Sequence, residues 1–241
     1  MPWKTFEVCL GRLPVEVDIH FSGYSEPWLH PECTRMVLSG HAAQHRIAVF
    51  TTATGMRPED VPQLARIPFK RFSVHLPDAD GLMRDPIDDR YLSTLAALRD
   101  AEIRNIEFFS VGPPHPDVLA VIDDVVDTRL LTSRAGNLPN LDVFGLVTVG
   151  LSVGHRRNPS SPIVCRKDRI FRNVLLPSGH VALCCMDYGL EHVLGNLLES
   201  DYDSLHRSEQ FLRVLNESTV GGNNILCGRC EYAVAGTYRW E

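Results

Sequence analysis

The first half of the chain alternates short apolar runs with segments of helical periodicity. The apolar runs predict strands at residues 15–21, 46–50, 69–75, 104–109 and 128–132. The segments between them predict helices at 31–45, 58–66, 88–101 and 116–126, and in the third of these Leu92, Leu95 and Leu98 recur at near-helical spacing. Repeated β–α units favour a parallel sheet whose ligand-bearing loops follow the carboxyl ends of the strands.

The pattern changes after residue 133. Residues 134–160 are rich in Gly, Asn, Pro and Ser, so we expect one domain at 1–135, a linker at 136–160 and a second domain at 161–241. In the second domain, two apolar runs flank Pro177-Ser178-Gly179-His180, which predicts a β-hairpin. Residues 202–215 predict a helix with one apolar face.

Composition and charge narrow the class of protein. The 241 residues are 44% hydrophobic and 22% charged, which is typical of a globular chain. A formal charge of −6 argues against nucleic-acid binding, which favours a basic surface. The sequence has neither the apolar core of a signal peptide near Met1 nor a membrane-spanning run, so we expect a cytoplasmic protein.

Four cysteines carry the candidate chemistry. Cys165 and Cys184 stand on either side of the predicted hairpin, and Cys227-Gly228-Arg229-Cys230 follows much later. Four thiolates can surround one tetrahedral metal or one iron–sulfur cluster, and in a reducing compartment clustered cysteines more often bind metal than form disulfides. A structural zinc is the nearest alternative, although such sites usually pair two Cys-x2-Cys knuckles. Cys185 is either a core residue or a substitute ligand for Cys184.

A second candidate site follows the first predicted strand. Gly23 allows the backbone to approach a ligand closely, and Glu26 can accept hydrogen bonds from an ammonium group. The simpler interpretation, in which Gly23 and Pro27 only form a tight turn between strand and helix, stays open.

Residues Ile19–Pro31 resemble the second strand and following loop of radical S-adenosylmethionine (radical SAM) proteins, and residues 51–55 resemble their next strand end. In that family the loop holds the amino group of the cofactor. The resemblance therefore implies an S-adenosylmethionine site, with Ala53 standing where the family has asparagine. The implied cofactor-binding residues are Gly23, Tyr24, Ser25, Glu26, Thr51 and Thr52.

The chain departs from that family in one respect. Radical SAM enzymes carry Cys-x3-Cys-x2-Cys after their first strand, and this sequence contains no such motif. Residues 3–13 resemble the helix that follows it, so we expect a partial (β/α) barrel missing its first strand. An open edge of this kind suggests a truncation or a partner chain. As given, the chain is not expected to cleave S-adenosylmethionine, which leaves its status as an enzyme open.

The cysteine pattern is similar to the SPASM domain, the auxiliary-cluster extension of many radical SAM enzymes. Full SPASM domains bind two clusters, but here Gly236 stands where the next cysteine is expected. The resemblance implies an α/β fold with a small cysteine-rich SPASM-like C-terminal domain and one auxiliary [4Fe–4S] cluster. It implies a parent activity of radical modification of a peptide or small metabolite. The alternative is a non-enzymatic scaffold or binding protein with a structural Zn or Fe–S site. The implied ligands are Cys165, Cys184, Cys227 and Cys230.

Overall fold

The computed structural model describes residues 1–22, 24–127, 135, 161–166 and 169–238, which form two compact units. One unit comprises Pro14–Arg129, and the other combines Met1–Leu13 with Leu130–Glu241. The predicted linker at 136–160 lies outside the described residues. None of the described helices is both long and apolar enough to cross a membrane.

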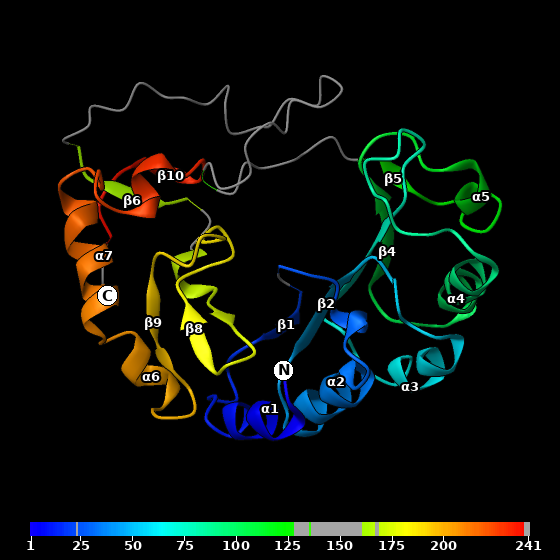
Figure 1. Cartoon of the computed structure of the whole chain (residues 1–241), viewed down its shortest axis with the longest axis horizontal. Coiled ribbons are helices and arrows are strands. Elements are labelled where there is room, and N and C mark those ends of the chain that lie inside the picture. The colour runs from blue at the N-terminus through cyan, green and yellow to red at the C-terminus, as the bar shows by residue number, and fades with distance from the viewer. Residues whose placement is uncertain (23, 128–134, 136–160, 167–168, 239–241) are drawn as a thin grey trace. The chain divides into compact units, whose positions relative to one another are not determined.

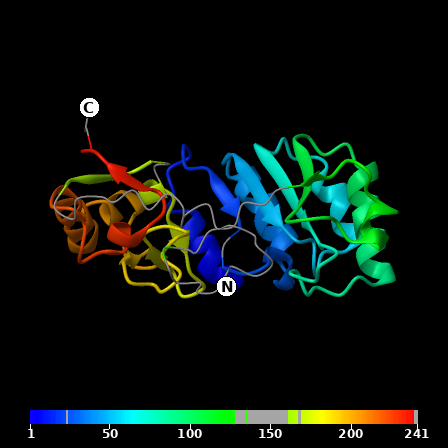
Figure 2. The same cartoon turned by 90° about the horizontal axis from the view of Figure 1, so that it is seen from above.

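The unit Pro14–Arg129 is built on a five-stranded parallel sheet in which strand order follows chain order (Figures 1 and 2). The strands are β1 (Ile19–Phe21), β2 (Ile47–Thr51), β3 (Arg71–Leu76), β4 (Ile106–Ser110) and β5 (Val126–Asp127). This confirms the predicted α/β class with a parallel sheet. Among the described residues no strand pairs with the other edge of β1; closure into a barrel and a missing first strand stay predictions.

Helices connect successive strands and lie along one face of this sheet (Figure 1). The elements are η1 (Pro27–Leu29), α2 (Cys33–Ala42), η2 (Pro58–Asp60), α3 (Val61–Leu64), α4 (Asp89–Asp100) and α5 (Pro116–Leu119). Their buried residues, such as Val37 and Leu95, share one apolar core with Val49 and Phe72 of the strands. α4 begins where the sequence predicts it, because the Asp88 carboxylate accepts a hydrogen bond from the Tyr91 N–H.

Two predicted elements are shorter in the structure, and a predicted strand lies outside the described residues. Residues 15–18 form a turn rather than the start of β1, because the Val17 N–H donates to the Pro14 carbonyl. α5 ends at Leu119, seven residues earlier than predicted, and Val126 instead belongs to β5. The fifth strand was predicted at 128–132, which lies outside the described residues.

The second unit contains two small antiparallel sheets (Figure 1). β7 (Val174–Leu175), β8 (His180–Ala182) and β9 (Val193–Asn196) form one, and β6 (Ile163–Cys165) pairs with β10 (Ala233–Ala235) in the other. The predicted hairpin is the β7–β8 connection, where Gly179 has a φ of +85°. A side chain there would also collide, since a Cβ atom would lie 2.5 Å from Asn196 Oδ1.

The helices of this unit are α1 (Trp3–Leu10), η4 (Arg169–Phe171), α6 (Tyr202–Leu205), α7 (Glu209–Thr219) and η5 (Leu226–Arg229). The single helix predicted at 202–215 is divided in two, because the Ser208 side chain caps α7 by accepting from the Phe211 N–H.

α1 belongs to the same compact unit as the cysteines, whereas the sequence analysis placed it in a domain at 1–135. Cys9 is fully buried in the core of this unit, and Arg12 Nη1 donates to the Ser200 carbonyl at 3.1 Å.

Candidate metal centre

Local structure brings the four predicted cysteine ligands together from three segments. Cys165 ends β6, Cys184 follows β8, Cys227 lies within η5, and Cys230 ends it. The β6–β10 pairing sets Cys165 opposite Ala233, only three residues after Cys230. The chain therefore closes a loop of more than sixty residues (165–230) with its cysteines at both ends.

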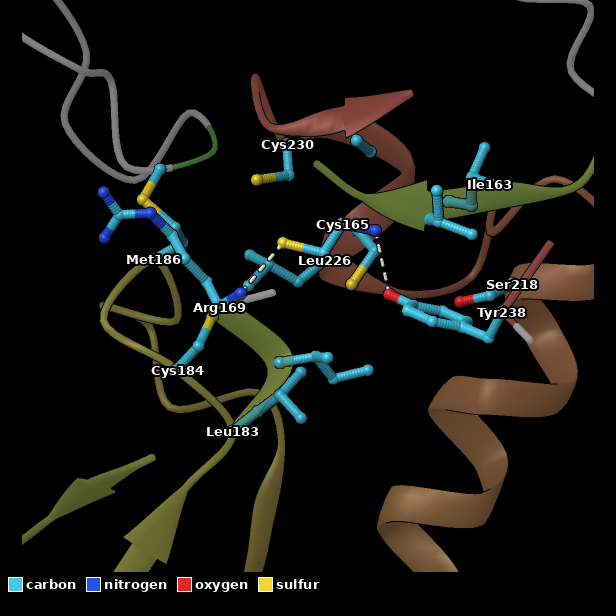
Figure 3. Close-up of a pocket in the computed structure, with 14 residues that line it drawn as sticks. Ile163, Cys165, Arg169, Leu183, Cys184, Met186, Ser218, Leu226, Cys230 and Tyr238 are labelled. Carbon is cyan, nitrogen blue, oxygen red and sulfur yellow. Dashed lines mark hydrogen bonds between the residues drawn. The ribbon is translucent and has the colours of Figure 1, made fainter. Parts of the chain in front are cut away.

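All four cysteines line one cavity (Figure 3). Cys184 and Cys230 are buried, and Cys165 and Cys227 are half-buried. The cavity has a volume of about 20 Å³, which is room for about one water molecule. A four-iron cluster is larger, so its binding would spread the lining side chains.

Burial controls the protonation of these thiols. The pKa of Cys184 is raised to about 12, mainly by burial and also by the neighbouring thiols of Cys185 and Cys230, against backbone hydrogen bonds that lower it. Burial likewise raises the pKa of Cys227, with further contributions from Cys184, Cys230 and Cys165. The thiols of Cys184 and Cys227 are thus protonated at neutral pH without a metal, and binding a metal displaces their protons.

A zinc ion and an iron–sulfur cluster require different arrangements of four thiols. A zinc ion with Zn–S bonds of about 2.3 Å draws four sulfurs into one small tetrahedron. Within the described part of the chain, no three Cys, His, Asp or Glu side chains come close enough to hold one metal ion. The four cysteines line a common cavity, and binding a zinc ion or a cluster there would require their side chains to shift.

Cys184 and Cys185 have different surroundings. Cys184 lines the cavity, whereas Cys185 is absent from its lining and its Sγ accepts a hydrogen bond from Arg169 Nη1 at 2.9 Å. Of this pair, only Cys184 lines the cavity with the other three cysteines. The geometry favours Cys184 over Cys185 as the fourth ligand.

A buried polar network positions the Cys227 segment. His192 Nε2 accepts from the Leu226 N–H at 3.1 Å, and the fully buried Asp187 accepts from the N–H groups of Glu191 and His192 at 2.8 Å. His192 Nδ1 lies 2.6 Å from the side-chain amide nitrogen of Gln210, which donates to it in the tautomer that leaves Nδ1 unprotonated. This network joins the loop after Cys184 to the residue that precedes Cys227.

The second candidate site, at the ends of β1 and β2, is organised by Glu26. Its Oε1 accepts from the Trp28 N–H at 2.9 Å and from Thr51 Oγ1 at 2.6 Å. Its Oε2 accepts from the Thr52 N–H at 2.6 Å and from Thr52 Oγ1 at 3.0 Å. Each carboxylate oxygen of Glu26 thus accepts two hydrogen bonds from this chain, one for each lone pair. An ammonium group would have to replace one of the hydroxyl donors.

The other predicted residues of this site lie beside Glu26. Tyr24 is half-buried and Ser25 is exposed, while Gly23 lies outside the described residues. The buried Ala53, where the radical SAM family has asparagine, has a φ of +63°, a backbone conformation that residues other than glycine rarely adopt. A strained residue directly after Thr52 is typical of a loop shaped for a ligand.

Two residues that contact the cysteine cavity, Arg169 and Tyr238, were not predicted from the sequence. The Arg169 N–H donates to Cys165 Sγ at 3.2 Å, and the Cys165 N–H donates to the Tyr238 hydroxyl at 2.9 Å. Both residues line the cavity (Figure 3). Neither residue belongs to a sequence motif with a fixed spacing from the cysteines, so only the folded structure shows that they border the cavity.

Comparison with known proteins agrees with this geometry. Residues 165–231 match the family model SPASM, an iron–sulfur cluster-binding domain. No curated protein matches the sequence. The fold is similar to that of BtrN in complex with AdoMet and 2-DOIA, with a TM-score of 0.60 and 16% identity over 96% of this chain and 78% of that chain.

Two further similar structures are of anSMEcpe. With bound AdoMet it gives a TM-score of 0.53 and 12% identity over 88% of this chain and 73% of that chain. With bound AdoMet and Kp18Cys peptide it gives 0.51 and 12% over 88% and 74%. These neighbours are radical SAM enzymes, and the predicted resemblance to a radical SAM protein with a SPASM domain is confirmed.

Proposed function

We propose that this chain, whose residues 165–231 form a SPASM domain, binds one auxiliary [4Fe–4S] cluster through Cys165, Cys184, Cys227 and Cys230. The observation that carries the proposal is the convergence of these four thiols, from three separate segments, on one cavity. When bound, such a cluster supplies one-electron transfer.

The residues of this chain hold the cluster in defined ways. The four cysteines lose their protons and bind iron, and the apolar lining from Ile163, Ile170 and Leu183 limits the access of water. The Asp187–His192 network fixes the approach to Cys227.

We also propose a parent activity of radical modification of a peptide or small molecule. This rests on the fold shared with BtrN, solved with AdoMet and 2-DOIA, and with anSMEcpe, solved with AdoMet and Kp18Cys peptide. A remnant S-adenosylmethionine site would use Gly23, Tyr24, Ser25, Glu26, Thr51 and Thr52. Cleavage of that cofactor is not assigned to this sequence, which contains no Cys-x3-Cys-x2-Cys. A partner chain at the free edge of β1 and a reducing, cytoplasmic location belong to the same proposal.

The test is the iron, sulfide and zinc content of the full chain purified without air, with its absorption spectrum. The proposal predicts about four irons and matching sulfide per chain. Replacement of Cys184 by alanine should remove most of the iron, and replacement of Cys185 by alanine should leave it bound. Stoichiometric zinc without sulfide would overturn the proposal in favour of a scaffold with a structural zinc.

A further inference from the structure

Arg169 brings a positive charge to the wall of the cysteine cavity. It lies four residues after Cys165 in η4 and is one of the residues that line the cavity. Its backbone N–H donates to Cys165 Sγ at 3.2 Å (Figure 3). The residue therefore touches a proposed ligand through its main chain and borders the cluster site through its side chain.

The guanidinium group is held in place by two contacts. Nη1 donates to Cys185 Sγ at 2.9 Å, and the guanidinium carbon lies 4.5 Å from the centre of the Tyr232 ring, in a cation–π arrangement. Both contacts come from residues directly beside proposed ligands, since Cys185 follows Cys184 and Tyr232 follows Cys230 by two positions. The charge is thus fixed relative to two ligand segments.

One donor of this group has no acceptor. Nε of Arg169 is buried, and among the described residues no atom accepts a hydrogen bond from it. An unpaired buried donor costs about 1–3 kcal/mol, so its persistence calls for an explanation. A cluster in the cavity would bring sulfide and thiolate sulfurs, which accept hydrogen bonds, close to this lining residue.

We propose that Arg169 is a positioning residue of the auxiliary cluster, and that its half-buried guanidinium raises the reduction potential of that cluster. A cubane with four thiolate ligands is negatively charged and gains a further negative charge when it accepts an electron. A fixed positive charge and an N–H donor at the cavity wall stabilise the reduced form more than the oxidised form. The inference rests on the proposed function, because it requires the cluster.

The experiment is a redox titration of the cluster in the full chain, with dithionite as the one-electron reductant and electron paramagnetic resonance of the reduced cluster as the signal. Arg169→Gln removes the charge and keeps the backbone N–H. Arg207→Gln, at an exposed position of the same unit, makes the same change in net charge and serves as the control. We expect R169Q to favour the oxidised cluster at least tenfold relative to R207Q, a lowering of the potential by 59 mV or more.

The possible results separate cleanly. A wild-type chain without iron and sulfide refutes the proposed function itself. A full cluster in R169Q with the potential of R207Q refutes the inference alone. If R169Q loses the cluster, Arg169→Lys decides, because it keeps the charge. A lysine variant with a wild-type potential supports the inference, and loss of the cluster or a lowered potential in that variant overturns it, since Arg169 would then act through packing.

Discussion

Gly228 stands between the paired cysteines of η5, and we predict that its replacement by alanine disrupts the cysteine site. A Cβ atom at this position would lie 2.1 Å from the carbonyl oxygen of Gly222 and 2.8 Å from its carbonyl carbon. Ordinary contacts are about 3.5 Å or longer, so one backbone segment has to move by more than about 1 Å. Because the obstacle is backbone, no side chain can rotate away to relieve it.

Overpacking of this kind costs typically about 1–3 kcal/mol, and the depth of the collision places Gly228→Ala at the upper end. With a urea dependence of about 2 kcal/mol per M, a loss of about 3 kcal/mol lowers the midpoint of unfolding by roughly 1.5 M. Displacement of Cys227 and Cys230 should also reduce the bound iron to less than about half of the wild-type content.

The assay is urea unfolding followed by far-ultraviolet circular dichroism, together with iron analysis. Gly11→Ala is the matched control, because a Cβ there lies 3.6 Å from the Glu7 carbonyl oxygen, in ordinary contact at the end of α1. The control should change the free energy of unfolding by less than about 1 kcal/mol. If Gly228→Ala unfolds at the same urea concentration as Gly11→Ala and keeps its iron, the steric argument is wrong.

Three further predictions concern stability. Glu26→Gln places an amide nitrogen against N–H or O–H donors and should lower the free energy of unfolding by about 1–2 kcal/mol, as measured by urea unfolding. Deletion of residues 1–13 exposes apolar core of the cysteine unit and should cost about 2 kcal/mol or more, seen as faster limited proteolysis of that unit; an unchanged rate would contradict the shared core. Burial lowers the pKa of His75, His192 and His206. The unfolded chain therefore takes up protons first as the pH falls below about 6.5, so the free energy of unfolding should decrease from pH 7 to pH 5, and constant unfolding midpoints would refute this.

Local sequence signals predicted much of the fold. The run Ile47–Thr51 is apolar and rich in β-branched residues, and it forms the second strand of the sheet. Asp88 begins α4 because its carboxylate caps the helix, and Gly179 allows the β7–β8 turn. Each of these signals depends on only a few neighbouring residues, so it can be recognised in the sequence.

Competition between local signals explains where the predictions were wrong. Val15-Glu16-Val17 alternates as a strand does, but the hydrogen bond from the Val17 N–H to the Pro14 carbonyl turns the chain instead. The apolar face of 202–215 continues through Ser208, yet a serine side chain gains more as a helix cap than within a helix. A prediction from hydrophobic periodicity alone does not take these hydrogen bonds into account.

The ligand cysteines could be named from their spacing, but their surroundings could not. Arg169 contacts Cys185, sixteen residues away, and no pattern in the sequence joins them. The choice between Cys184 and Cys185 also depends on which of the two side chains lines the cavity. Contacts of this type depend on the packing of several segments at once, so they emerge only in the folded chain.

The location of α1 has a consequence for the energetics of the cysteine site. An amphipathic helix at residues 3–10 signals that one face is buried, but not against which partner. Here Cys9 shares an apolar core with Cys184 and Cys230, so the two ends of the chain fold as one unit. A cluster that binds only the folded unit stabilises everything in that core, including α1. Substitutions at Cys9 and at the ligands should therefore be non-additive in unfolding, because each acts on the same cooperative core.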